Sequence, residues 1–239
     1  MSALHRFFVG ADAVHGARAR LGGDQAKQIA DVLRLAAGGR VVLVRDGEEL
    51  EVRLDSVGRS HVDATVVERR PCLAEPRVRL TLGLPLLRGD RSEEVIEAVT
   101  QLGVARIVPF TSERSVARDL SPAKRARWER IARESAETAR RGRIPEIASL
   151  VGWTDLFAVI EPPVIVAWEE EHERRLRDGV SAGLDRLSLV IGPEGGLTSD
   201  EIVLARGRGA TIVSLGPRNL RSETAAVAAV AEVVASLEP

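Results

Sequence analysis

The sequence is poor in the residues that build disulfide frameworks, metal centres and membrane spans. It has a single cysteine, Cys72, so a disulfide within the chain is impossible. Its histidines are scattered, and none has the spacing of a metal-ligand cluster: His5, His15, His61 and His172. We therefore expect no metal. Because no apolar run approaches the roughly 18–20 residues of a membrane span, we expect no membrane association either.

The beginning of the sequence also lacks a recognisable targeting signal. The residues MSALHRFFVG contain neither the long apolar segment nor the small-residue cleavage site of a signal peptide. Hydrophobic residues make up 44% and charged residues 29% of the chain, which is typical of a folded globular protein. We predict a cytoplasmic protein of one large or two small domains.

Lysine and tyrosine are scarce, which bears on nucleic-acid binding. Of 34 basic residues only Lys27 and Lys124 are lysine, and tyrosine is absent. Arginine binds phosphate through paired hydrogen bonds and stacks on bases, but a GC-rich coding sequence explains the same bias. The net charge of −1 argues against a uniformly basic binder. Composition alone therefore leaves RNA binding open.

The first 72 residues have the pattern of a small antiparallel β domain. Residues 40–70 contain alternating, β-branched segments, and plausible hairpin turns stand at Asp46-Gly47 and at residues 57–60. A linker is predicted over PCLAEP, residues 71–76.

A short helix is predicted to interrupt this β domain. It covers GDQAKQIADVLRL, residues 23–35, and its periodicity places Ile29, Val32 and Leu33 on the side facing the core.

Beyond residue 76 the pattern alternates between strand and helix. Helices are predicted from Ser92 to Leu102 and from Ser121-Pro122 onward. The predicted strands are apolar throughout, as strands covered on both faces must be: RVRLTLGL, ARIVPF, VIVAW, LSLVIG and TIVSLG. This order predicts an α/β domain with a parallel sheet over residues 73–239.

Two glycine-proline loops follow predicted strands of this sheet. IGPEGGLTSDE, residues 191–201, and SLGPRNLRSETA, residues 214–225, each lead from an apolar run into a helix. Thr198 and Glu201 have the spacing of a capping box for the first of these helices. Because ligands bind outside the carboxyl ends of parallel strands, we expect both loops at one site. A tight strand-to-helix turn explains either loop taken alone.

Neither loop matches a known phosphate-binding pattern. There is no GxxxxGK[ST], and Pro193 and Glu194 interrupt the pattern that a dinucleotide loop requires. No G-x-S-x-G elbow of a serine hydrolase is present. Glu194 would oppose a pyrophosphate and suits a cationic ligand, although a carboxylate near a helix start needs no ligand to explain it. ATP and nicotinamide enzymes are therefore disfavoured.

The two loops in this order resemble the paired carboxy-terminal signature of the RsmE family, the 16S ribosomal RNA (uridine-N3)-methyltransferases of the SPOUT superfamily. LLRGDRSEEVIEAVTQLGVARIVPFTSERS, RWERIARESAETARRGRIPEI, HRFFV and VLRL are similar to family segments as well. The resemblance implies an RNA-binding, PUA-like β-barrel over residues 1–72. For residues 73–239 it implies a SPOUT α/β domain with a deep trefoil knot and a parallel sheet. This domain is expected to bind the cofactor, to catalyse methyl transfer and to form the dimer.

The resemblance also implies the reaction and the partners. The cofactor is S-adenosyl-L-methionine, and the product is 3-methyluridine in 16S rRNA of the small ribosomal subunit. The substrate is expected to be the assembled subunit, and the protein is expected to be a homodimer. The apolar last segment, TAAVAAVAEVVASL, fits a dimer interface or burial within one chain equally well.

Motif positions carry the family's site residues onto this chain. The cofactor-binding residues implied in this way are Ala167, Ile191, Gly192, Pro193, Glu194, Gly195, Gly196, Leu215, Gly216, Leu220 and Arg221. The expected RNA contacts, each of which also suits an ordinary surface charge, are Arg6, Arg34, Arg88, Arg91 and Arg114.

Two catalytic candidates follow from the chemistry of uridine, whose N3 is a poor nucleophile until it loses a proton. Arg221 is expected to stabilise the uridine anion or to grip the adjoining phosphate. Glu223 is a candidate base acting through water, although a carboxylate in the first turn of a helix also serves as a dipole partner.

The sequence departs from the commonest family pattern outside the two loops. Ala98, Gln101 and Thr138 replace more usual residues, and the histidine that usually precedes VLR is missing. These changes bear on the RNA target more than on methyl transfer. The alternatives are another SPOUT RNA methyltransferase with a different target and a non-catalytic RNA-binding assembly factor; the intact GPEGG and LRSET loops argue against the latter.

Overall fold

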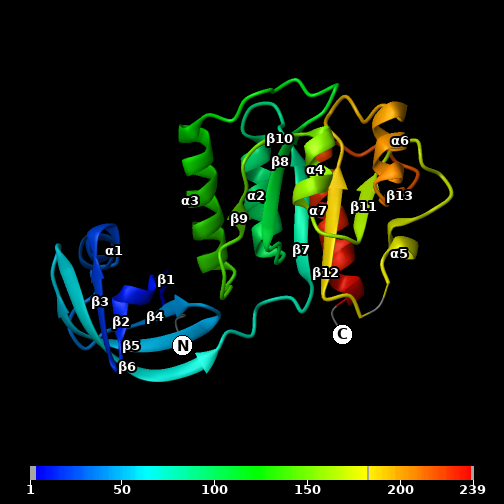
Figure 1. The fold of residues 1–239 in the computed structure, drawn as a ribbon. Helices are drawn as coiled ribbons and strands as arrows, with labels where there is room; N and C mark the ends of the chain where they lie inside the picture. The colour runs from blue at the N-terminus through cyan, green and yellow to red at the C-terminus, as the bar shows by residue number, and fades with distance from the viewer. Residues whose placement is uncertain (1–3, 182, 238–239) are drawn as a thin grey trace. The chain divides into compact units, whose positions relative to one another are not determined.

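The computed structural model describes residues 4–181 and 183–237, and the chain divides into two compact units (Figure 1). The first unit comprises Met1–Glu75 and Ala136–Arg143, and the second comprises Pro76–Ser135 and Ile144–Pro239. The contacts therefore divide the chain after Glu75, where the sequence suggested residue 72. They also give the first unit a segment from much later in the chain.

The first unit contains a six-stranded sheet in the order β1-β4-β5-β6-β3-β2. Its strands are β1 Arg6–Phe8, β2 Val14–His15, β3 Arg18–Gly22, β4 Arg40–Arg45, β5 Glu48–Val57 and β6 His61–Pro71. β1 pairs with β4 in parallel, and the other neighbours are antiparallel. Both predicted hairpin turns are present. Asp46 and Gly47 have φ of 51° and 83°, as a tight hairpin turn requires.

The predicted helix of the first unit is present, but its second half is wound as a π-helix. α1 spans Gly23–Lys27 and η2 spans Gln28–Val32; the Leu33 N–H donates to the Gln28 carbonyl, five residues back, at 2.9 Å. In this wider turn, residues four apart lie more nearly on one face than residues three apart, so Leu33 shares the face of Ile29 better than Val32 does. Ile29 is fully buried, whereas Val32 is 72% exposed. The prediction that Val32 faces the core was wrong for this reason.

A buried ion pair holds the returning segment Ala136–Arg143 in the first unit. Arg141 is 1% exposed, and its Nε and Nη2 donate to the two carboxylate oxygens of Glu75 at 3.1 and 2.8 Å. Glu75 Oε1 also accepts the backbone N–H groups of Gly142 and Arg143. A buried guanidinium is tolerated only with such pairing, so Glu75 fixes where this segment lies.

The second unit is the predicted α/β domain with a parallel sheet. Its seven strands lie in the order β10-β8-β7-β12-β11-β13, with β9 beside β8, and every pair is parallel. The strands are β7 Arg79–Pro85, β8 Arg106–Thr111, β9 Glu146–Ile147, β10 Val151–Gly152, β11 Val164–Ala167, β12 Arg186–Ile191 and β13 Thr211–Val213.

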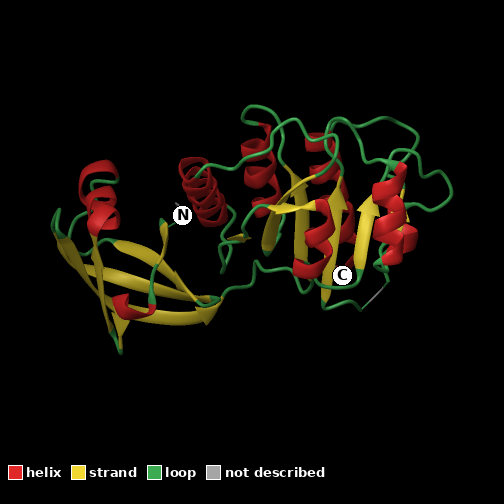
Figure 2. Cartoon of the chain, turned by 45° about the horizontal axis from the view of Figure 1, so that its top comes forward, coloured by secondary structure: helices red, strands yellow, loops and turns green. Residues whose placement is uncertain are grey.

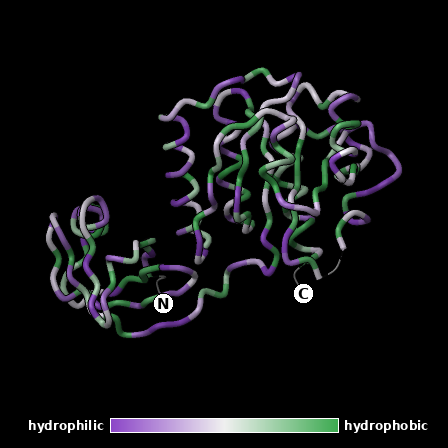
Figure 3. The backbone as a smooth tube through the Cα atoms, viewed as in Figure 1, coloured by the Kyte–Doolittle hydropathy of each residue, from purple (hydrophilic) through white to green (hydrophobic). Residues whose placement is uncertain are grey.

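Helices cover both faces of this sheet (Figure 2). They are α2 Arg91–Gln101, α3 Pro122–Thr138, α4 Trp153–Val159, α5 Leu176–Gly179, α6 Ser199–Gly207 and α7 Ser222–Leu237. β11 shows the division between the faces: Ile165 and Ala167 join the core with α2, α3, α5 and α7, and Val164 and Val166 join the core with α4 and α6. Much of this sheet is accordingly drawn in green, the colour of hydrophobic residues, in Figure 3.

The apolar segment at the end of the sequence forms α7. It follows β13 at the edge of the sheet, yet it packs against α2, α5 and β12. Ala226, Ala229, Val230 and Val233 are buried there. None of the helices in residues 4–181 and 183–237 combines the length and the hydropathy needed to cross a bilayer.

The carboxylate of Glu201 connects three segments of the second unit. The predicted capping box is present: Glu201 Oε2 accepts from the Thr198 N–H at 2.9 Å, and Thr198 Oγ1 accepts from the Glu201 N–H at 3.3 Å. Glu201 Oε1 accepts from the Glu113 N–H, beyond the end of β8, at 2.8 Å. One side chain thus fixes the start of α6, the loop after β12 and the loop after β8.

We expect Glu201→Ala to lower the free energy of unfolding of the second unit by about 1–3 kcal/mol, because two backbone N–H groups lose their acceptor. Asp200→Ala is the matched control, since it removes an exposed carboxylate from the same helical turn and costs only about 0.3–1 kcal/mol. Urea unfolding followed by tryptophan fluorescence measures both, because Trp128, Trp153 and Trp168 all belong to the second unit. Equal losses in the two variants would contradict the role given to Glu201.

Candidate functional site

A cavity of about 990 Å³ lies at the carboxyl ends of β11, β12 and β13. These strands are neighbours, with β11 between the other two, so the loops that follow them meet. The lining consists of Ala167, Trp168, Glu169 and His172 after β11, residues 191–195 after β12, residues 214–222 after β13, Ala225, and Arg91 from the start of α2. Both predicted loops therefore contribute to one cavity.

Nearly all residues predicted to bind a cofactor line this cavity. They are Ala167, Ile191, Gly192, Pro193, Glu194, Gly195, Leu215, Gly216, Leu220 and Arg221. Gly196 belongs to the same loop but is not part of the lining. Glycines and the apolar residues Ile191, Leu215 and Leu220 therefore border the same space.

Glycine is favoured at two positions of the loop after β12, by a positive φ at Gly196 and by a close neighbour at Gly195. Gly196 has φ of 72°, and a Cβ there would collide with the carboxylate of Glu169. A Cβ on Gly195 would lie 2.9 Å from Cβ of Arg114, closer than such atoms approach. Glycine alone permits both the left-handed conformation and the contacts. The loop is thereby held against the segments that follow β8 and β11.

The loop after β11 forms a third wall, and Ala167 is the only residue of this wall that the sequence motifs predicted. Trp168, Glu169 and His172 line the cavity, and Trp168 Nε1 donates to the Leu197 carbonyl at 3.2 Å. These residues follow the apolar run VIVA directly, so the rule that ligands bind beyond strand ends would have found them. Their loop lacks the glycine-proline pattern that drew attention to the other two.

The structure separates the arginines that were expected to contact RNA. Arg88, Arg91 and Arg114 belong to the second unit and lie at the cavity loops: the Arg88 N–H donates to Glu194 Oε1 at 3.1 Å, and Arg114 Nη1 donates to the Gly195 carbonyl at 3.2 Å. Arg6 and Arg34 belong to the first unit. Arg34 is exposed.

Arg6 differs from the surface contact that was expected. Its side chain is 8% exposed, and Nη1 lies 2.6 Å from Glu49. Burial raises the pKa of Glu49, but hydrogen bonds from Arg70 and Arg6 outweigh burial, so the pKa lies below its ordinary value. Arg6 is therefore committed to an ion pair inside the first unit and has little surface left for a phosphate.

A small cluster of charges borders the cavity at the starts of α2 and α7. Arg91 Nη1 lies 3.7 Å from Glu194 Oε1, and Arg91 Nε lies 3.8 Å from Glu223 Oε1. Glu223 is not among the lining residues, and its side chain is 19% exposed. Arg221 is exposed and lines the cavity, and within residues 4–181 and 183–237 its guanidinium has no ion pair. The cavity lining thus contains three arginines, Arg91, Arg218 and Arg221, with carboxylates nearby.

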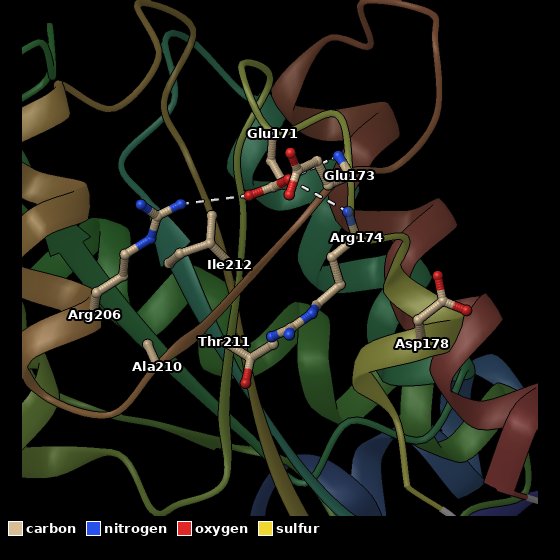
Figure 4. A pocket seen from close by; sticks show the side chains of 8 residues that line it. All are labelled: Glu171, Glu173, Arg174, Asp178, Arg206, Ala210, Thr211 and Ile212. Carbon is tan, nitrogen blue, oxygen red and sulfur yellow. Dashed lines mark hydrogen bonds and ion pairs between the residues drawn. The ribbon is translucent and has the colours of Figure 1, made fainter.

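A second cavity, of about 600 Å³, lies along β13 near Ala210–Ile212 (Figure 4). Glu171 accepts from the Glu173 N–H at 2.8 Å and pairs with Arg206 at 3.4 Å. The Glu173 N–H, with smaller contributions from Arg174 and Arg206, holds the pKa of Glu171 below its ordinary value. Since neither glycine-proline loop lines this second cavity, and Glu171 and Arg206 in it are already paired with each other, we take the cavity at the strand ends as the functional site. Across the described part of the chain, metal-ligating side chains form no cluster of three or more.

Comparison with known proteins agrees with this geometry. Residues 74–234 match the model of a family described as an RNA methyltransferase domain. The ribosomal RNA small subunit methyltransferase E of Bacillus subtilis is 30% identical over 88% of this chain and 87% of that protein. The protein of the same name from Mycobacterium bovis is 32% identical over 91% and 86% of the two chains.

Solved structures of proteins with similar names have the same fold as this chain. Ribosomal RNA small subunit methyltransferase E from Neisseria gonorrhoeae, bound to S-adenosyl methionine, superposes with a TM-score of 0.88 at 26% identity and covers 98% of both chains. A putative methyltransferase from Legionella pneumophila, in complex with the bound cofactor SAM, gives a TM-score of 0.82 at 26% identity over 98% of both chains. With the α/β fold and the two loops at the ends of β12 and β13, these similarities show that the chain belongs to the ribosomal RNA small subunit methyltransferase E family.

Proposed function

We propose that this protein transfers a methyl group from S-adenosyl-L-methionine to N3 of a uridine in 16S rRNA of the small ribosomal subunit, and that the product is 3-methyluridine. The observation that carries the proposal is the cavity at the ends of β11, β12 and β13, built by the paired glycine-proline loops in a chain of this family. The assembled subunit is the proposed substrate, and the cytoplasm is the proposed location.

The cavity residues fit S-adenosyl-L-methionine. The volume of about 990 Å³ lies at the upper end of the range for small-molecule sites. Gly192, Gly195 and Gly216 leave backbone groups accessible to a ligand, and the carboxylates of Glu169 and Glu194 suit a ligand that carries positive charge. The bound group supplies a methyl on a sulfonium: the sulfur–carbon bond breaks, the electron pair stays on sulfur, and a bond forms between carbon and N3.

The proposed cofactor-binding set keeps the residues expected from the sequence. It comprises Ala167, Ile191, Gly192, Pro193, Glu194, Gly195, Leu215, Gly216, Leu220 and Arg221 in the lining, with Gly196 holding the loop in shape, and it gains Trp168, Glu169 and His172. Their task is to hold the donor in line with the nucleophile, which is a positioning problem that needs no metal.

The protein must also stabilise a uridine that has lost its N3 proton. Arg221 is proposed for this task, because its exposed guanidinium lines the cavity and can donate to a uracil oxygen as negative charge develops there. It would alternatively grip the neighbouring phosphate. Glu223 was expected to act as a base, but its carboxylate borders Arg91 outside the lining, which favours an indirect role.

We extend the proposal to the fold and its partners. The deep trefoil knot is supported by the path of α7, which follows edge strand β13 yet packs against α2 and β12. It is also supported by residues 174–176, which hydrogen-bond to Ser214 just beyond β13, at 2.8 and 3.1 Å. We propose that the first unit is a PUA-like barrel that binds RNA, and that a homodimer forms on α7, where Val227 and Val234 are only partly buried.

We expect 3-methyluridine to appear when the protein is incubated with S-adenosyl-L-methionine and small ribosomal subunits from a strain that lacks this methylation. The RNA is digested, and nucleosides are identified by mass spectrometry against a standard. A different methylated nucleoside would indicate another RNA target. Cofactor binding by calorimetry without any methylated nucleoside would indicate a non-catalytic RNA-binding factor.

We expect Arg221→Ala to retain cofactor binding, because the other residues of the cofactor-binding set remain, and to lose turnover by roughly 100-fold, the usual cost of removing one donor to a developing anion. Arg208→Ala, which removes an exposed arginine at the end of α6, is the control and keeps full activity. Equal turnover in the Arg221 variant and the wild type would remove Arg221 from the mechanism.

We expect Gly196→Ala to weaken cofactor binding. A side chain at positive φ costs about 1–2 kcal/mol, and Gly196 has φ of 72°, so the loop is expected to leave its binding conformation. The dissociation constant measured by calorimetry should rise by roughly 5- to 30-fold, following the usual conversion of free energy to affinity. Gly207→Ala is the control, since its Cβ meets open space. Unchanged affinity in the Gly196 variant would show that the loop tolerates a side chain.

A further inference from the structure

Arg91 is held beside the cavity by two carboxylates, but its hydrogen-bond donors remain free. It is the first residue of α2 and lines the cavity. Its separations of 3.7 Å from Glu194 and 3.8 Å from Glu223 suit ion pairs and are too long for hydrogen bonds. Within residues 4–181 and 183–237 the Arg91 side chain makes no hydrogen bond. A guanidinium is rich in N–H donors, so Arg91 is positioned without being satisfied.

One of the two carboxylates that hold Arg91 is itself fixed by a backbone N–H group. Glu194 belongs to the loop after β12 and accepts from the Arg88 N–H at 3.1 Å. Glu223 belongs to the first turn of α7, and its Oε2 is buried without a hydrogen-bond partner in the described part of the chain. Arg91 therefore connects the cofactor loop with the start of α7, and its 40% exposed side chain is open on the cavity side.

We propose that Arg91 is a second catalytic cation, whose free N–H groups donate to an oxygen of the target uracil, and that Glu223 is a positioning residue that orients Arg91. This inference rests on the proposed methylation of uridine N3. It gives Arg91, which the sequence suggested as an RNA contact, a role in catalysis, and it replaces the role of base suggested for Glu223.

The chemistry balances without a protein base. The N3 proton passes to water, and the negative charge left on the ring spreads to the two uracil oxygens. Arg91 and Arg221 donate to these oxygens, and the N3 electron pair forms the bond to the methyl carbon. The two guanidinium groups stabilise the anion as donors whose N–H groups point to where the negative charge develops.

A phosphate contact and a catalytic donor at Arg91 predict different measurements. Loss of a phosphate contact weakens RNA binding and makes it less dependent on salt, because fewer counterions are released. Loss of a donor to the uracil anion leaves the KM for RNA and the salt dependence unchanged and lowers kcat. It also makes the reaction more dependent on high pH, since deprotonation of N3 is no longer assisted.

The test compares Arg91→Ala, Arg91→Lys, Glu223→Gln and the double variant Arg91→Ala/Glu223→Gln. The matched control is Arg127→Ala, which removes an ion pair of 2.7 Å to Glu93. Glu93, like Arg91, lies in the first turn of α2. Rates are measured by 3-methyluridine formation across pH and divided by the wild-type rate at each pH. This division removes the titration of groups common to all variants at the cavity, namely Glu169, His172, Glu194, Arg88, Arg218 and Arg221. RNA affinity against salt and cofactor affinity by calorimetry are measured separately.

We expect Arg91→Ala to lower kcat by roughly 100-fold at neutral pH, as for other single donors to a developing anion. The deficit should shrink as the pH rises, and RNA affinity, its salt dependence and cofactor affinity should stay as in the wild type. Arg91→Lys should retain an intermediate rate, which keeps the test valid if the alanine variant fails to fold. Glu223→Gln should cost much less in the Arg91→Ala background than alone, because it acts through Arg91.

Three results would overturn the inference. One is weaker RNA binding with a smaller salt dependence and an unchanged kcat, which would restore the phosphate contact. Another is an Arg91→Ala deficit that does not change with pH, and the third is additive losses for Arg91 and Glu223. Failure of the wild type to form 3-methyluridine would instead refute the proposed function, and the salt dependence of RNA binding would still test Arg91 as a phosphate contact.

Discussion

The geometry of the site depends on one buried carboxylate, that of Glu201, which is 8% exposed. Its two oxygens accept backbone N–H groups from Thr198 and Glu113, and charge-assisted bonds of this kind are stronger than neutral ones. They set the distance between the loop after β12 and the segment after β8, where Gly195 packs against Arg114. If this distance changed, the wall of the cavity formed by residues 191–195 would move with it.

Sequence periodicity predicted most of the fold because its signals are local. The apolar runs of β7, β8, β11, β12 and β13 are strands buried on both faces, and the glycine in Asp46-Gly47 marks a hairpin that is present. Val32 was misplaced because a π-helical turn depends on packing and not on composition. The return of Ala136–Arg143 to the first unit depends on the Arg141–Glu75 ion pair, which joins positions far apart in the sequence. No local pattern reveals such a pair.

The same distinction between local and distant signals holds for the site. Gly192, Gly195 and Gly216 could be predicted, since glycine at the end of a buried strand permits a close approach that a side chain would block. Trp168 and Glu169 could have been found by treating the end of β11 like the ends of β12 and β13. The surroundings of Arg91 could not, because its two carboxylates come from segments more than a hundred residues away along the chain. The position of Arg91 in a family-like segment therefore suggested an RNA contact, whereas its two carboxylate partners suggest a role in catalysis.

The ion pair between Glu75 and Arg141 has a consequence for the order in which the protein folds during synthesis. The first unit includes Ala136–Arg143, so its native contacts cannot be completed when residues up to 75 have left the ribosome. At that stage Arg141 has not been synthesised, so Glu75 has no partner. The contacts of the first unit stay incomplete while the start of the second unit is synthesised. Assembly of the first unit therefore ends only after β7, β8 and α3 have been made, which couples the maturation of the two units in time although each has its own core.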